Sequence, residues 1–333
     1  MPKESYEDMR TYHVEVITHK DRLPELPSDN FFHSAQLFSV LYDTPGVKPF
    51  MTVAYDEKHT VRGHMLGIMM RRLMLLPPFM YHQAHVYGEG VYADEGEKPL
   101  VFKAMLHQVT RFLRHRLCLN IEFSDISRKM FGYKAFREEG YFPVAWMHIH
   151  NSLHSMNPYD RLDKRMKARI KKSYAQGVET RAVADDAELH SFYKSLRGYF
   201  WLKPTRYIPK EQFFKSVHLL GNGHIYGTFY KHTCIGGSAV IYSEGNAYLW
   251  YVCSRMKSFT LLHPRLLTVW HVINQAYQDG MQHIFFMNVG LPFKRNRYRD
   301  FLLSFGGKPV STYRWFRCNI SWVNKLLSWW YRE

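Results

Sequence analysis

The sequence predicts a mixed α/β fold that is built twice along the chain. Three observations support this: the same order of helices and strands recurs in both halves, each copy opens with Phe-Phe-x-Ser, and a glycine precedes each last strand. Each copy reads as a helix, an antiparallel meander, and a long helix crossing to a strand expected beside the third. That order is typical of a mixed sheet and not of a doubly wound parallel one.

The first copy begins with a helix in which apolar residues recur every three or four positions. Two strands follow around a polar turn, and a third strand leads into a glycine-rich, acidic loop. A long amphipathic helix, a strand, a short helix and a last strand complete the copy. The expected segments, in this order, are 31–41, 48–69, 80–88, 88–99, 100–116, 117–126, 128–140 and 141–150.

The second copy repeats this order with a shorter loop after its third strand. Its long helix carries a proline near the start and a glycine at the end, which are common helix boundaries. The expected segments are 213–220, 224–242, 246–254, 255–260, 261–280, 281–290, 293–307 and 308–316.

Two domains are expected, residues 1–157 and 158–333, because 333 residues are long for a single core. The first holds 18 Lys and Arg and 18 Asp and Glu, whereas the second holds 27 and 11, so the net charge of +16 lies in the second half. Such a charge favours an anionic partner: a nucleotide, a phosphorylated substrate, RNA or a lipid headgroup. Residues 161–172 carry seven of these cations and read as part of a helix that ends at Gly177.

Several classes of protein are excluded by what the sequence lacks. The four cysteines show no paired spacing, which argues against a disulfide framework or a cysteine zinc site and fits a reducing compartment. His148 and His150 share a strand face without a third ligand at useful spacing, and HExxH is missing, so no metal is expected. No signal segment and no long apolar run is visible, so a cytoplasmic protein is expected, with peripheral contact to the inner face of a membrane as a further option.

Two stretches resemble a known family. The segment RMKARIKKSYAQGVETR is similar to the basic "K-x-x-R-x-x-I-K-K-A…G-V" segment of Fem-type (FemABX) and FemAB-like acyltransferases. The stretch YLWYVCS…LLHPRLLTVWHVINQAYQDGMQHIFF is similar to the strand, helix and strand of that family's second domain. The resemblance implies two tandem GNAT-like domains. It also implies transfer of an acyl or aminoacyl group, from acyl-CoA (acetyl-CoA among them) or aminoacyl-tRNA, to an amine.

The chain departs from the family at several places. The acidic residue often found in the strand after the long helix is missing: the chain reads FFMNVG there, with Asn288 nearby. Of the F-K-x-x-F-G element, Phe305-Gly306 carries the F-G, and either Phe301-Leu302 or Phe293-Lys294 stands where Phe-Lys belongs. Ordinary GNAT domains hold the CoA pyrophosphate on a Q/R-x-x-G-x-G/A loop at a helix N-terminus. Here the corresponding loop of the second copy has no glycine, and that of the first copy is acidic.

Candidate site residues follow from the resemblance together with the needs of acyl transfer. Backbone N–H groups near Tyr251–Ser254 are expected to hold the carbonyl oxygen, and G-x-S-x-G is absent, which argues against a serine nucleophile. The candidates for proton transfer are Tyr251, Ser254, His263 and Tyr298. Those for binding the donor are Val252, Cys253, Arg255, Lys257 and Arg265. Those for binding substrate or phosphate are Arg165, Arg169, Lys172, Asn288, Phe293 and Lys294.

The leading hypothesis is therefore a direct-transfer N-acyltransferase, acting on a small-molecule or lipid-linked amine in cell-envelope or lipid metabolism. The alternative is a non-catalytic module that has lost its donor site and binds RNA or anionic lipid. The C-terminal segment places Trp322, Leu326, Trp329 and Trp330 close to helical spacing. We expect it to dock as a final helix on the second domain, with contact to a membrane interface as the alternative.

Overall fold

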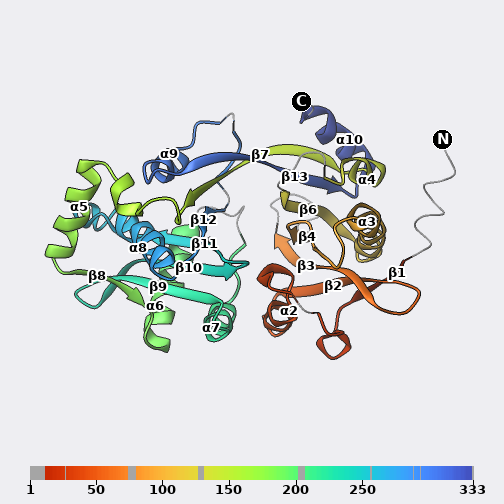
Figure 1. The fold of residues 1–333 in the computed structure, drawn as a ribbon, viewed down its shortest axis with the longest axis horizontal. Helices are drawn as coiled ribbons and strands as arrows, with labels where there is room; N and C mark the ends of the chain where they lie inside the picture. Colours follow the sequence, from red (N-terminus) through yellow and green to blue (C-terminus); the bar gives the residue numbers. More distant parts are fainter. Residues whose placement is uncertain are drawn as a thin grey trace. The chain divides into compact units, whose positions relative to one another are not determined.

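The computed structural model describes residues 12–26, 28–73, 80–126, 131–201, 207–255, 257–287, 289–292 and 294–331. The chain forms two compact units (Figure 1). Unit 1 comprises Met1–Trp146 with Ser311–Glu333, and unit 2 comprises Met147–Val310. The domain boundary between residues 157 and 158, which was expected from the repeats along the chain, stays a prediction.

Unit 1 is a mixed sheet packed against helices. Its strand order is β1-β2-β3-β4-β6-β13, and the short β5 pairs with β3. The strands are β1 His13–Ile17, β2 Val47–Tyr55, β3 Val61–Leu73, β4 Met80–Tyr87, β5 Val91–Tyr92, β6 Cys118–Ile126 and the second part of β13 Lys308–Cys318. The helices are α2 Ala35–Tyr42, α3 Lys98–His115, α4 Tyr133–Glu138 and α10 Ser321–Trp330, with 3-10 turns η2 Lys20–Arg22 and η3 Phe31–His33.

The main core of unit 1 lies between α3 and the sheet. Apolar residues of α3, Phe102 among them, are fully buried against strand residues that alternate toward the helix. Trp315 of β13 is also fully buried and stacks on Phe136 of α4, with ring centroids 4.5 Å apart. The last strand of the chain is thus part of this core.

Unit 2 repeats the architecture. Its strand order is β7-β12-β11-β10-β9-β8. The strands are β7 Phe142–Ser152 (its second part), β8 Val178–Ala182, β9 Gly223–Tyr230, β10 Thr233–Ser243, β11 Asn246–Ser254 and β12 His283–Phe286. The helices are α5 Lys164–Ala175, α6 Asp186–Phe200, α7 Glu211–Leu219, α8 Pro264–Gln278 and α9 Arg297–Leu303, with 3-10 turns η4 Pro158–Arg161 and η5 Thr260–Leu262.

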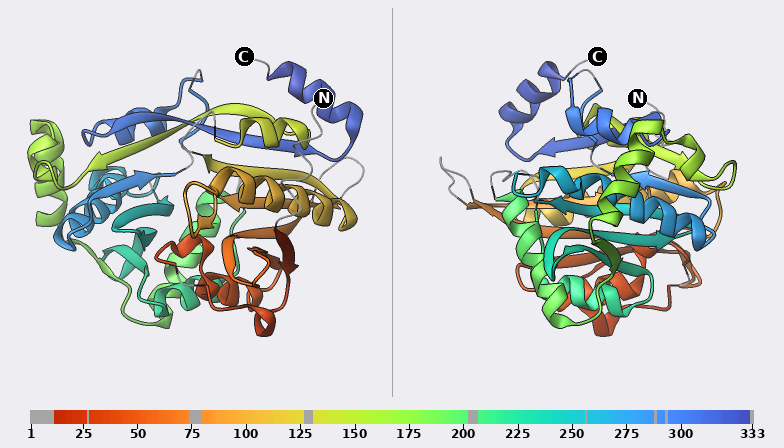
Figure 2. Two further views of the ribbon diagram at one scale, coloured as in Figure 1. Left: turned by 45° about the vertical axis from the view of Figure 1, so that its right-hand side comes forward. Right: turned by 90° about the vertical axis from the view of Figure 1, so that its left-hand side faces the viewer.

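Two consecutive glycines of β10 let helices approach both faces of this sheet. A Cβ on Gly236 would lie 2.6 Å from the Thr268 hydroxyl of α8, and one on Gly237 would lie 2.5 Å from the Phe192 ring of α6. Because successive strand residues point to opposite faces, α8 and α6 lie on opposite sides of the sheet, as Figures 1 and 2 show. The position of α8 therefore depends on a residue without a side chain.

We expect Gly236→Ala to lower the free energy of unfolding by about 1–2 kcal/mol, because the added methyl group forces α8 away from β10. Denaturant unfolding measures the effect. Gly198→Ala is the matched control: an added Cβ there meets no heavy atom within 4 Å, and the residue lies in α6. That variant should gain about 0.5 kcal/mol through its less flexible unfolded chain. Equal stability of the two variants would contradict the close packing of α8.

The last strands of the two repeats are exchanged between the units. In unit 2, β7 of the first repeat pairs antiparallel with β12, for example Ser152 with His283. In unit 1, β13 of the second repeat pairs antiparallel with β6, for example Phe316 with Glu122. Each unit thus borrows the strand that completes its sheet.

The predicted mixed α/β fold in two copies is confirmed. So is the crossover in each copy, since β4 pairs parallel with β6 and β11 with β12. The structure differs in detail. The helix α6 was not predicted, and the strand expected at 281–290 is shorter, since β12 extends only over His283–Phe286. Of the helix expected at 128–140, residues 128–130 lie outside the described residues; the described part contains α4, which begins after Gly132 in a left-handed conformation (φ 60°).

No helix in the described ranges is both long enough and apolar enough to span a bilayer.

All four cysteines carry free thiols. Burial raises the pKa of Cys118 to about 12 and the pKa values of Cys234 and Cys253 above their usual range. These three thiols are therefore poor nucleophiles.

Candidate functional site

Strands β11 and β12 of unit 2 separate after three residue pairs. They pair in parallel only from Ala247 to Leu249, whereas β11 continues to Ser254. On its other edge β11 remains paired with β10 to Ser254, with a bulge at Trp250. Within the described part of the chain, the edge of β11 beyond Leu249 has no pairing with β12.

The register shows which backbone groups face this opening. Arg255 donates its N–H to the carbonyl of Ile235 at 2.7 Å. Because such bonds alternate along an antiparallel strand, the N–H groups of Val252 and Ser254 point away from β10, toward the opening. Unpaired N–H groups in this arrangement are the kind of donor that stabilises the oxyanion of acyl transfer.

The corresponding strands of unit 1 do not separate. β4 and β6 pair from His82 to Tyr87, and the next N–H, that of Gly88, donates to the carbonyl of Ser124 at 2.8 Å. No equivalent opening exists between these strands over their described length. The two units thus differ where the fold would place a donor.

The acidic loop after β4 is used in local ion pairs. Lys98, at the start of α3, lies 3.2 Å from the carboxylate of Glu89. Arg62 lies 2.7 Å from Glu97. Glu89 and Glu97, two of the acids expected to be unfavourable for phosphate, therefore pair with cations of the same unit.

The first turn of α8 lies directly after β11 and the 3-10 turn η5. His263, the residue before the helix, is left-handed (φ 47°), and Pro264 is the first helical residue. Proline has no N–H, and Leu267 already donates to the carbonyl of His263 at 3.2 Å. The N–H groups of Arg265 and Leu266 are left without partners inside the helix, at its positive end.

Cations gather at this helix end. Arg169 and Lys172 of α5 lie close enough to His263 that their charges act on its imidazole. Arg265 lies over the Phe301 ring at 5.7 Å, and its buried Nε has no hydrogen-bond partner. In the part of the chain that the structure describes, none of these three cations pairs with a carboxylate. The cluster is suited to a phosphate, which would bring the missing negative charge.

The pKa of His263 is lowered from its ordinary value, first by burial and then by the charges of Arg169 and Lys172. The imidazole is therefore neutral at pH 7 and able to accept a proton. The protonation of His263 is thus tied to two members of the cation cluster.

We expect the imidazole of His263 to titrate below pH 6.5 in an NMR pH titration. Replacing Arg169 and Lys172 by glutamine should raise its pKa, and so should saturation with inorganic pyrophosphate, because each removes net positive charge. Since protonation adds a cation, phosphate affinity should rise as the pH falls through this pKa. A pKa that neither change moves would contradict the arrangement.

The other proton-transfer candidates lie in the same unit with other contacts. The Tyr251 hydroxyl donates to the carbonyl of Tyr207 at 3.3 Å. Ser254 is buried at the end of β11. Tyr298 packs on the core beside Phe301, at 6.4 Å between ring centroids. The structure thus places all four candidates in unit 2, with Ser254 and His263 at the two ends of one short loop.

The predicted binding residues separate into groups. Val252, Cys253, Arg255 and Lys257 lie in β11 and the loop after it, where Arg255 is over the Phe259 ring at 5.5 Å. Arg165 and Lys294 are exposed. Asn288 and Phe293 lie outside the described residues, and so does Met256 of the loop.

Two residues that the sequence analysis missed organise the segment before α9. Asn296 donates to the carbonyl of Val289 at 2.6 Å and caps α9 through its side-chain oxygen. Arg299 donates to the carbonyls of Leu291 and Lys294. An asparagine just before a helical pattern was the available signal. The guanidinium of Arg299 is engaged in these local hydrogen bonds.

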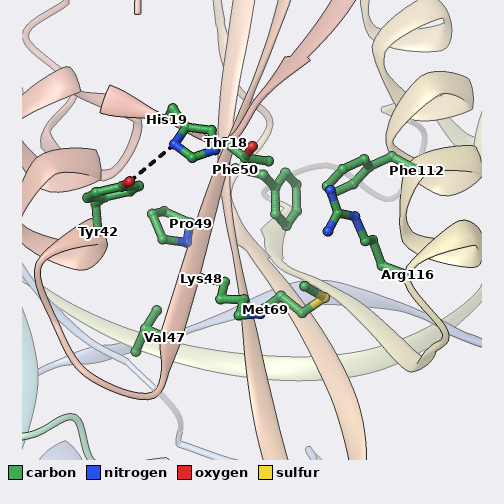
Figure 3. Close-up of a pocket in the computed structure, with 10 residues that line it drawn as sticks. All are labelled: Thr18, His19, Tyr42, Val47, Lys48, Pro49, Phe50, Met69, Phe112 and Arg116. Carbon is green, nitrogen blue, oxygen red and sulfur yellow. Dashed lines mark hydrogen bonds between the residues drawn. The ribbon is translucent and has the colours of Figure 1, made fainter. Parts of the chain in front are cut away.

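A separate hollow of about 290 Å³ lies in unit 1, where β1 leaves the start of β2 (Figure 3). The rings of Phe50 and Phe112 and the cations Lys48 and Arg116 are among its lining residues. It contains none of the predicted site residues.

In the described ranges no group of three or more His, Cys, Asp or Glu side chains is arranged to hold a metal ion. The expectation that the protein holds no metal stays a prediction.

Comparison with known proteins bears on this arrangement. Residues 161–295 match the family model of the acetyltransferase (GNAT) domain. The matched range contains α5, the separated end of β11 and the start of α8, which is the region with the opening and the cations. A search of curated proteins finds no match.

Solved structures extend the likeness to the whole chain. A crystal structure of FemX is similar at a TM-score of 0.63 with 8% identity, over 98% of this chain and 99% of that one. The C-terminal domain of a putative lysylphosphatidylglycerol synthetase from Agrobacterium fabrum gives 0.57 with 11% identity, over 97% and 96%. A tandem GNAT protein from the clavulanic acid biosynthesis pathway gives 0.54 with 9% identity, over 95% and 94%. The predicted FemAB-like fold with tandem GNAT-type domains is thereby confirmed.

Proposed function

We propose that the protein is an N-acyltransferase whose donor site lies in unit 2. The observation that carries the proposal is the separation of β11 from β12 beside a helix N-terminus, with three cations that pair with no carboxylate among the described residues. The donor is an acyl or aminoacyl group on a phosphate-bearing carrier, either acyl-CoA or aminoacyl-tRNA. The acceptor is an amine, small or lipid-linked, of the cell envelope or of lipid metabolism.

Each part of the site has a chemical role in this proposal. The N–H groups of Val252 and Ser254 hold the carbonyl oxygen as negative charge develops on it. Arg169, Lys172 and Arg265 hold phosphate groups of the carrier. The buried Nε of Arg265 without a partner fits this role, because a bound phosphate would supply an acceptor.

The reaction forms an amide and releases the carrier. The amine nitrogen attacks the carbonyl carbon, the C–S bond to CoA or the C–O bond to tRNA breaks, and the amine loses a proton. Neutral His263 is the favoured proton acceptor, because the Tyr251 hydroxyl is engaged with a backbone carbonyl.

The proposal is tested by incubating the protein with acetyl-CoA or longer acyl-CoAs and a panel of primary amines, while CoA thiol release is followed. A parallel arm uses aminoacyl-tRNA and follows transfer of the labelled aminoacyl group. Amine-dependent release in either arm supports the proposal and identifies the carrier. Binding of both carriers without turnover of any amine would count against it.

A non-catalytic module for RNA or anionic lipid is the second candidate. It is favoured by one observation: Pro264 and the lack of a glycine loop leave α8 with few backbone donors for a pyrophosphate. This function requires sequence-blind RNA affinity that falls steeply with salt, together with no turnover in either arm.

A further inference from the structure

The helix α10 presents its apolar side chains to solvent. Trp322, Leu326, Trp329 and Trp330 are 70%, 53%, 64% and 73% exposed, and the helix has no buried residue. The spacing of four, seven and eight residues from Trp322 puts all four on one face of the helix. We call these four residues the tryptophan face.

The helix is held in this orientation by its polar residues. The side-chain amide of Asn324 donates to the carbonyl of Gly140 at 2.8 Å, and its oxygen accepts from the N–H of Cys318 at 2.8 Å. Tyr331 stacks on Phe142 at 6.2 Å between ring centroids. The prediction that this segment docks on the second domain is therefore wrong: α10 belongs to unit 1, beside α4.

Cations lie beside one end of the tryptophan face and on α3 of the same unit. Arg137 of α4 and Lys325 of α10 line one hollow together with Trp329. Arg111 and Arg114 line a neighbouring hollow on α3. None of these four cations pairs with a carboxylate in the part of the chain that the structure describes.

The two acids at the end of α4, Glu138 and Glu139, are already paired. Glu138 lies 3.0 Å from Lys103, and Glu139 lies 2.6 Å from His107 and 3.9 Å from Arg317. Among the described residues, the charge left over beside the exposed indole rings is therefore positive.

We propose that this face of unit 1 binds the surface of an anionic lipid bilayer. Indole rings partition into the headgroup region, where the apolar ring is buried and the ring N–H stays hydrated, and Lys and Arg attract anionic headgroups. A second copy of the chain fits less well. A symmetric contact through this face would bring its unpaired cations together.

The proposal concerns unit 1 and does not rest on the donor site of unit 2. The experiment is sedimentation of the full chain with phosphatidylcholine vesicles containing 30 mol% phosphatidylglycerol, against pure phosphatidylcholine vesicles, at low and high salt. We expect binding to the anionic vesicles to be at least about tenfold stronger, to weaken with salt, and to shift tryptophan emission to the blue.

Variants separate the two contributions. The triple variant Trp322→Ser/Trp329→Ser/Trp330→Ser should lower the partition coefficient at least about tenfold. The double variant Arg137→Gln/Lys325→Gln should lower it about fivefold for each charge removed. The matched control is Trp201→Ser, which removes a tryptophan that is 77% exposed in unit 2 and should leave binding unchanged. Thermal unfolding verifies that all variants are folded.

Three outcomes would overturn the proposal. One is equal, weak sedimentation with both kinds of vesicle. Another is an equal loss of binding in Trp201→Ser and the triple variant. The third is a dimer of the wild-type chain that the triple variant converts to monomer while vesicle binding is absent, which would assign the face to a second copy.

Discussion

Arg314→Met is expected to lower the free energy of unfolding by about 3–5 kcal/mol, because it leaves the buried carboxylate of Glu122 without its main partner. Arg314 Nη1 lies 2.6 Å from Glu122 Oε1, and the two side chains are only 8% and 10% exposed. The guanidinium also lies over the Trp146 ring at 4.0 Å. Methionine keeps much of the packing volume, so the loss reports chiefly on the charge.

A double-mutant cycle isolates the pair. Glu122→Gln/Arg314→Met should be more stable than the sum of the two single losses predicts, because neither charge is then buried alone. Lys20→Met is the control, since Lys20 and Asp43 form an exposed ion pair at 3.0 Å whose loss should change stability far less than the loss of the buried pair.

This result bears on the strand exchange as well as on one ion pair. Glu122 lies on β6 of the first repeat, and Arg314 lies on β13, the last strand of the second. If β13 completed the sheet of its own repeat instead, the two residues would not be partners. Additive losses in the cycle would contradict the exchange.

Sequence periodicity predicted the elements well but not the exchange of strands. The segments 141–150 and 308–316 both alternate, and both follow a glycine. Either one has the pattern required to pair beside either β6 or β12. Because pairing between distant strands depends on the folded backbone and not on local pattern, the sequence held no signal for this choice.

The parts of the candidate site that depend on the order of elements along the chain could be predicted from the sequence. The parts that depend on tertiary contacts could not. The loop after β11 was located from the order of elements, and the cations of α5 from composition. That Arg169 and Lys172 lie beside His263 follows only from the packing of α5 near α8. No pattern in the residues predicted the separation of β11 and β12, since the sequences of β4 and β11 do not reveal which pair stays closed.

The second large effect is expected at the cation cluster. Arg169→Gln/Lys172→Gln/Arg265→Gln should weaken binding of the productive carrier about 100-fold, because each charge-assisted contact with phosphate is worth roughly 1 kcal/mol at a partly exposed position. Isothermal titration with the carrier that supports turnover measures the loss. Thermal unfolding verifies that the variant remains folded without the Arg265–Phe301 contact.

The control for this experiment must carry the same change in net charge. Lys164→Gln/Lys171→Gln/Lys194→Gln removes three exposed cations from α5 and α6 that do not act on His263. If the three cations form a specific phosphate site, the first variant should lose much of its affinity for the carrier and the second variant little. Only the first variant should then change the salt dependence of binding. Equal losses would mean that the carrier responds to the overall charge of the second repeat, since a diffuse field does not distinguish the three cations around α8 from any other three.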